Sequence, residues 1–85
     1  MAATGLKVIA GTVDIEAQPP IDGHIPGREI DLTNTLINQN SIDGSLTMLA
    51  GDTSAPIATD RIVFVNTHVL SRSGAVDIEP TPTSP

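Results

Sequence analysis

The sequence predicts an all-β domain, and three features of its composition support this prediction. β-Branched residues dominate, with ten Ile, six Val and ten Thr among 85 residues; they lose rotamer freedom in helices and pack well on a pleated surface. Seven Gly and seven Pro interrupt the chain at short intervals, and no long segment shows apolar residues at helical spacing. We therefore predict a single small β-sandwich or barrel of five to six mostly antiparallel strands.

The first two strands are predicted from alternating apolar residues. Residues 6–15 alternate, but the apolar phase shifts by one residue at Gly11, which is typical of a β-bulge. Residues 29–37 alternate more regularly, with Ile30, Leu32 and Leu36 expected inward, and Asn34 interrupts this inward row. Each segment is expected to form one strand.

The second half of the chain predicts two hairpins. Asp43-Gly44 favours a type I′ turn that leads into a strand over residues 45–50. Residues 62–65 are apolar on both faces, so the strand over residues 61–70 is expected at the centre of the sheet. Residues 71–74 predict a second hairpin turn before a last strand over residues 75–79.

One domain is expected over residues 1–85, because a chain of this length is near the lower limit for an independent core. Its β core is predicted over residues 6–79, with an N-terminal arm over residues 1–5. Residues 80–85 read PTPTSP and predict an extended C-terminal arm. The proline-rich loop over residues 18–27 is expected to make contacts. No solenoid or propeller period is predicted.

One short segment recurs within the chain. Residues 11–16 read GTVDIE and residues 74–79 read GAVDIE. In both copies Val and Ile are expected on one face and Asp and Glu on the other. Two interpretations stay open: an ordinary edge-strand pattern with a charged outer face, or two pseudo-equivalent edge strands.

The net charge of −6, with one Lys and three Arg, argues against partners that are themselves anionic. Nucleic-acid binding depends on Lys and Arg, and on aromatic stacking for single strands, while an anionic membrane surface repels such a chain. No apolar run approaches a membrane span, and no secretory signal is recognised at the N-terminus. We expect neither nucleic acid nor membrane as a partner, and no secretion through a signal peptide.

Few residues suggest metal or catalytic chemistry. His24 is expected on a loop surface and His68 partly buried in a strand, without the ligand spacing of a metal site. Asp22-Gly23 and Asp43-Gly44 are interpreted as turns rather than calcium loops. No cofactor, metal or catalytic residue is predicted.

The segment Gly51-Asp52-Thr53-Ser54 resembles the active loop of aspartic proteases, in which two carboxylates share a proton. Ser54 stands where that family has Gly, and Gly51 where it has an apolar residue. A turn is therefore the preferred interpretation. A dimeric aspartic-protease-like enzyme using Asp52 is the least favoured alternative, and we predict that the chain is not an enzyme.

The chain has no cysteine, so a partner or an oligomer is expected to supply stability that disulfides would otherwise give. Its size, β-branched composition and extended ends resemble small decoration (cement) proteins of tailed-phage capsids. That resemblance implies a virion location, contacts with the major capsid protein, and a homo-oligomer such as a trimer. The alternative is a soluble adaptor or regulatory β module, which would be cytoplasmic.

Overall fold

The computed structural model describes residues 1–17, 29–51 and 59–84, and these ranges contain strands and no helix. In chain order the strands are β1 (Ala2–Thr4), β2 (Lys7–Ala10), β3 (Val13–Ala17), β4 (Glu29–Thr33), β5 (Leu36–Gln39), β6 (Leu46–Ala50), β7 (Arg61–Val65), β8 (His68–Ser71) and β9 (Val76–Glu79). They form three sheets, in the orders β1-β4-β7, β2-β5-β8 and β3-β6-β9. All of these strand pairs are parallel.

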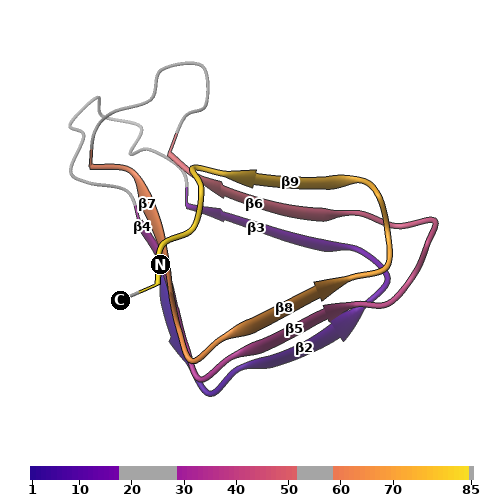
Figure 1. The fold of residues 1–85 in the computed structure, drawn as a ribbon, viewed down its shortest axis with the longest axis horizontal. Helices are drawn as coiled ribbons and strands as arrows, with labels where there is room; N and C mark the ends of the chain where they lie inside the picture. Colours follow the sequence, from indigo (N-terminus) through magenta and orange to yellow (C-terminus); the bar gives the residue numbers. More distant parts are fainter. Residues whose placement is uncertain (18–28, 52–58, 85) are drawn as a thin grey trace.

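Each strand pairs with the strand three places further along the chain, so the chain winds through successive coils. Coil 1 holds β1–β3, coil 2 holds β4–β6 and coil 3 holds β7–β9. The three sheets form the sides of a triangular prism (Figure 1). This is a β-solenoid. The all-β prediction is confirmed, but the prediction of five to six mostly antiparallel strands is wrong: the described residues hold nine strands and all their pairs are parallel. The sheets do not face one another as in a two-layer sandwich.

The predicted long strands are divided by corners between sheets. Gly11 separates β2 from β3, Asn34 separates β4 from β5, and Asn66 separates β7 from β8. The change of apolar phase at Gly11, interpreted above as a bulge, therefore marks the point where the chain leaves one sheet for the next. A corner and a bulge give the same pattern in sequence, because both shift which face the alternate residues occupy.

The solenoid repeat was missed because its length varies from coil to coil. Val13 pairs with Leu46, and Leu46 pairs with Val76. Fewer residues separate the second pair along the sequence than the first, so the repeat length differs between coils. Lys7 aligns with Leu36, and this step is shorter than either. Turns of different length between the strands remove any fixed period, although the strands themselves stay in register.

The predicted hairpin turns join strands of different sheets, so neither hairpin forms. Asp43-Gly44 lies between β5 and β6, and residues 72–75 lie between β8 and β9. Gly44 is required for close approach rather than for an I′ turn. A Cβ atom on Gly44 would lie 1.8 Å from the carbonyl oxygen of Gly11 in the neighbouring coil.

The core fills the prism with inward apolar side chains from all three sheets. Its buried members are Val13, Ile30, Leu32, Ile37, Leu46, Met48, Ala50 and Ile62. The side chain of Gln39 is buried with them. Its Nε2 donates to the carbonyls of Gly11 (2.6 Å) and Ser41, and its Oε1 accepts from the Ser71 hydroxyl (2.6 Å) and the Ser73 amide (3.0 Å). One amide thus connects the second corners of all three coils.

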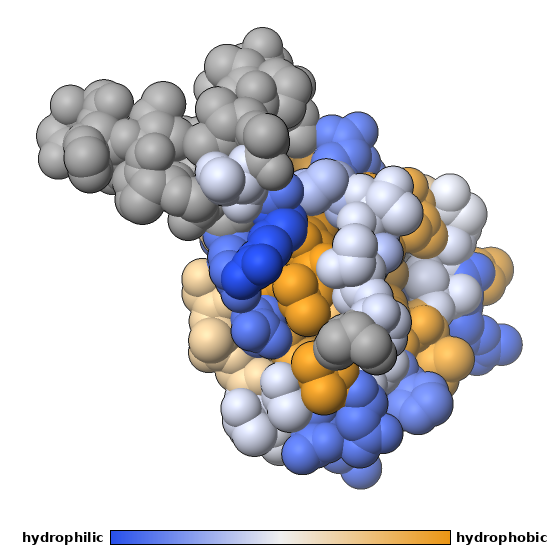
Figure 2. All heavy atoms as spheres, turned by 60° about the vertical axis from the view of Figure 1, so that its left-hand side comes forward, coloured by the Kyte–Doolittle hydropathy of each residue, from blue (hydrophilic) through white to orange (hydrophobic). Residues whose placement is uncertain are grey.

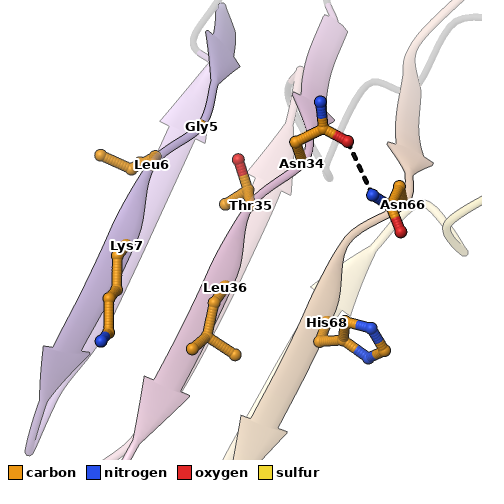
Figure 3. A pocket seen from close by; sticks show the side chains of 8 residues that line it. All are labelled: Gly5, Leu6, Lys7, Asn34, Thr35, Leu36, Asn66 and His68. Atoms are coloured by element: carbon orange, nitrogen blue, oxygen red, sulfur yellow. Dashed lines mark hydrogen bonds between the residues drawn. The ribbon is translucent and has the colours of Figure 1, made fainter.

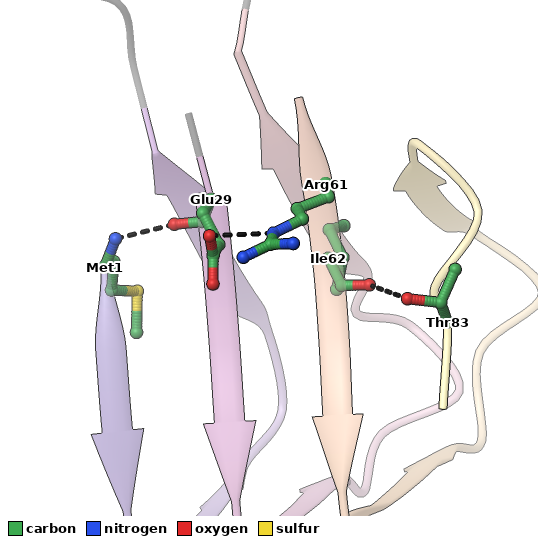
Figure 4. Close-up of polar contacts among 5 residues, drawn as sticks. All are labelled: Met1, Glu29, Arg61, Ile62 and Thr83. Carbon is green, nitrogen blue, oxygen red and sulfur yellow. Dashed lines mark hydrogen bonds and ion pairs between the residues drawn. The ribbon is translucent and has the colours of Figure 1, made fainter. Parts of the chain in front are cut away.

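Polar contacts also tie the first sheet together across its coils (Figure 4). The N-terminal ammonium of Met1 donates to the Glu29 carbonyl (2.6 Å), and Arg61 Nε lies 2.8 Å from Glu29 Oε2. Beyond β7, Thr83 donates its amide to the Ile62 carbonyl and forms a parallel bridge with Val63. On the side of the molecule where β4 and β7 lie, a narrow hydrophobic band runs between polar residues (Figure 2).

These contacts use both segments that were expected to be arms. Residues 2–4 form β1 and pair with β4, while Thr83 pairs with β7. The strand β7, expected at the centre of its sheet, is the last named strand in the order β1-β4-β7. Its outer edge is paired with the chain at Thr83.

Candidate functional site

The outer face of β2-β5-β8 is the candidate interaction surface. Its outward side chains are Lys7, Ile9, Leu36, Asn38, His68 and Leu70. They form two rows across the strands, because Lys7, Leu36 and His68 are aligned in register, as are Ile9, Asn38 and Leu70. The intervening residues of the same strands point into the core.

Large apolar side chains are unusually exposed on this face. Ile9 and Leu70 are each 55% exposed, and they flank Asn38 on either side. Two strand spacings separate them, which is about 10 Å. Leu36 lies between them in the neighbouring row and is half-buried. Single exposed apolar residues are ordinary, but apolar residues grouped on one rigid face are typical of contact surfaces.

A groove of about 410 Å³ lies where this face meets the first corner. It is lined by Gly5, Leu6, Lys7, Asn34, Thr35, Leu36, Asn66 and His68 (Figure 3). Gly5, Asn34 and Asn66 occupy the same corner in successive coils, and each has a positive φ of 48–69°. This left-handed conformation suits Gly and Asn better than other residues.

The corner is held by a ladder of polar contacts. Asn66 Nδ2 donates to Asn34 Oδ1 at 2.7 Å. Just inside, the Thr67 hydroxyl donates toward the carbonyls of Leu32 (2.8 Å) and Val65 (3.0 Å). These contacts fix the backbone that lines the groove.

The groove and the neighbouring acidic face differ in charge. Lys7 and His68 are the ionisable residues among the eight that line the groove, and none of the eight is a carboxylate. The outer face of β3-β6-β9 instead carries Asp14, Glu16, Asp77 and Glu79, all exposed. In a chain of net charge −6, the outward residues of β2, β5 and β8 therefore include no carboxylate.

Two properties of the polar side chains hold across the described ranges. Within residues 1–17, 29–51 and 59–84, no three His, Cys, Asp or Glu side chains come together in a way that could hold a metal ion. The same ranges leave no buried side-chain nitrogen or oxygen without a hydrogen-bond partner. Of the polar residues that line the groove, Lys7, Asn34, Asn66 and His68 are exposed, whereas Thr35 is buried and its hydroxyl donates to the Thr33 carbonyl (3.0 Å).

The residues considered from sequence are found in several places. His68 is the first residue of β8 and is exposed, so its expected partial burial is wrong. It faces outward because the inward register of β8 falls on Val69. Asp43 lies exposed in the turn before β6. Asp22-Gly23, His24, the loop over residues 18–27 and Asp52 lie outside the described residues.

Sequence reasoning did not identify the groove or its face. A signal was present, because the pair Asn34-Thr35 recurs as Asn66-Thr67. The step between these two pairs equals the step from Leu36 to His68, which are partners in the register of β5 with β8. Aligning the sequence on itself at the two Asn-Thr pairs would have placed the corners.

Of the residues that the structure describes, none belong to a helix long and apolar enough to cross a membrane. No family model, no curated protein and no solved structure matches this chain.

Proposed function

We propose that this chain is a non-catalytic structural protein that docks on another protein through the outer face of β2-β5-β8. The observation that carries the proposal is the exposure of Ile9 and Leu70, at 55% each, on one flat parallel sheet. Burying such side chains at an interface releases water from apolar surface. The strands beneath them are held by a core and by corner hydrogen bonds, so little conformational entropy is lost on docking.

The charge distribution supports the same surface. Carboxylates are costly to bury without partners, and interface cores are depleted of them. None lies in the groove or in the two outward rows of this face. Asn38 at the centre offers an amide donor and acceptor that can fix the orientation of the partner.

The partner we propose is a viral shell, with the chain acting as a decoration protein bound to the major capsid protein. A homo-oligomer, such as a trimer, would present several copies of this face at one junction between shell subunits. Apolar area buried across such a joint would hold neighbouring subunits together. The role is mechanical and the location is the virion.

The proposal is tested with single variants at the face and away from it. Ile9→Ser and Leu70→Ser should each weaken cosedimentation with purified particles of the encoding virus by about tenfold. Ile42→Ser is the matched control, because Ile42 is 73% exposed but lies in the turn between β5 and β6. It should bind as the unmodified chain does.

The oligomeric state is tested separately, by light scattering across a dilution series with circular dichroism. An oligomer whose melting temperature falls on dilution supports assembly as a source of stability.

Equal binding by Ile9→Ser, Leu70→Ser and Ile42→Ser would reject the docking face. A stable monomer that never binds shells would reject the decoration role in favour of a soluble adaptor.

A further inference from the structure

The two ends of the solenoid present unpaired strand edges. Among the described residues, β3 and β9 each pair with β6 on one side only, and β2 and β8 each pair with β5 on one side only. Coil 1 therefore ends in the free edges of β2 and β3, and coil 3 in those of β8 and β9. On the remaining side of coil 3, Thr83 pairs with β7, so a second copy that continued the stack would have to displace the segment around Thr83 before its own β1 could pair with β7. Backbone amides and carbonyls along a free edge are a template for another strand.

The inward side chains at the two ends match one another. If coil 3 of one copy continued into coil 1 of a second copy in the same register, Val69 would meet Val8. By the same alignment Val76 would meet Val13, and Ile78 would meet Ile15. Val76 is 47% exposed in the single chain, whereas Val13, the residue in the same row of coil 1, is 5% exposed. A second copy would supply the missing cover.

The outward side chains of the same strands oppose this contact. Within the chain, Asp14 and Asp77 lie on either side of Thr47. In the next outward row, Leu49 separates Glu16 from Glu79. The carboxylates of each row are thus two strands apart, or about 10 Å. In an end-to-end contact they would lie on adjacent strands about 4.8 Å apart, where like charges are destabilising.

We propose that the ends of the solenoid form a self-association interface for a second copy of this chain, held off by the matched carboxylates of β3 and β9. The repeated VDIE segments then have one shared role, because only opposed copies of the same pattern place acid against acid in both rows. Neutral side chains in place of the carboxylates on either β3 or β9 would remove this repulsion. Such a contact is head-to-tail and has no closed end, so it would give open filaments.

This inference does not rest on the proposed docking face. The docking face is the outer surface of β2-β5-β8, whereas stacking uses strand edges at the ends of the prism. Rods whose length grows with concentration would indicate stacking, and compact closed oligomers would indicate contact through a surface other than the ends of the prism.

The test replaces the acidic residues with lysine on β9 or on β3, and then on both strands. Asp77→Lys/Glu79→Lys places lysines opposite Asp14 and Glu16 of the next copy, and Asp14→Lys/Glu16→Lys does the same from the other end. Each double variant should self-associate at least about tenfold more tightly than the unmodified chain. The quadruple variant opposes lysine to lysine, so its association should fall back to the unmodified level.

If net charge alone controlled association, the double and quadruple variants would behave alike. Two Asp or Glu to Lys changes raise the net charge by four, from −6 to −2, and four changes raise it by eight, to +2. The double and quadruple variants therefore carry net charges of equal size, and general repulsion would treat them alike. Association is followed by light scattering, and rod length by small-angle X-ray scattering.

A milder variant guards against misfolding. Asp77→Asn/Glu79→Gln keeps side-chain shape and should also associate more tightly than the unmodified chain. Raising salt from about 0.01 M to about 1 M shortens the Debye length from about 30 to about 3 Å, so the unmodified chain should associate more strongly. Folded double variants that stay as monomeric as the unmodified chain, or a quadruple variant that associates as they do, would overturn the proposal.

Discussion

The buried side-chain amide of Gln39, in coil 2, binds the backbone of Ser73 at the corresponding corner of coil 3. The Ser73 amide donates to Gln39 Oε1 at 3.0 Å, and the Ser73 hydroxyl donates to the Gly44 carbonyl at 2.6 Å. The Gln39 Nε2 reaches the Gly11 carbonyl of coil 1 at 2.6 Å. A polar residue at the end of an apolar strand thus aligns three successive turns.

Replacing Gln39 should destabilise the fold strongly. Gln39→Leu keeps a similar volume but leaves the Gly11 carbonyl and the Ser73 amide without this partner in a buried corner. Each buried group left unsatisfied costs about 1–3 kcal/mol, so we expect a loss of about 3 kcal/mol, measured by urea unfolding. Asn38→Leu is the control, because this neighbouring amide faces outward and its loss should change stability little.

A methyl group at Gly44 should also destabilise the protein. Its Cβ would lie 1.8 Å from the Gly11 carbonyl oxygen, so the two turns must separate. Overpacking of this kind costs about 1–3 kcal/mol. Gly74→Ala is the matched control, since nothing lies within 4 Å of a Cβ there. Thermal unfolding should show a lower Tm for Gly44→Ala only, and equal Tm values would contradict the close contact.

The corner at Gly5 should accept an asparagine. Gly5 has φ 69°, occupies the coil 1 position of Asn34 (φ 49°), and a Cβ there meets nothing within 4 Å. Asn tolerates this conformation better than Ala and could extend the amide ladder. Gly5→Asn should be more stable than Gly5→Ala by about 1 kcal/mol. Chemical denaturation of both variants checks this difference, and a less stable Asn variant would argue against the ladder.

The ion pair between Glu29 and Arg61 should give a small pH dependence. The Arg61 side chain, by hydrogen bond and charge, lowers the pKa of Glu29 from its usual value. A carboxylate with a lowered folded-state pKa stabilises the protein above its ordinary pKa, and this contribution is lost as pH falls through the folded-state pKa.

We therefore expect the Tm of the unmodified chain to exceed that of Glu29→Gln at neutral pH. The gap should close below the lowered pKa, where both side chains are uncharged. Differential scanning calorimetry from pH 7 down to pH 2 measures it. The gap should be small because this pair is exposed to solvent, and a gap that widens in acid would be inconsistent with the pKa direction.

The sequence located the strand-forming segments and much of their inward pattern. Ile30 and Leu32, expected inward, are fully buried, and Asp14 and Glu16, expected outward, are exposed. Leu36, also expected inward, faces outward, because the corner at Asn34 shifts the inward register of β5 to Ile37. Alternation is a local property, because successive side chains of any strand point to opposite faces. It is the same in parallel and antiparallel sheets, so it could predict strands and faces without predicting their partners.

The tertiary structure decided how these strands are joined and which side chains meet. Phase changes at Gly11 and Asn34 are compatible with a bulge, an interruption or a corner, and only the parallel register distinguished them. The docking face and the opposed acidic edges bring together residues of different coils, such as Ile9 with Leu70. Their proximity depends on turn lengths and on buried corner contacts such as Gln39 with Gly11, which no local pattern encodes.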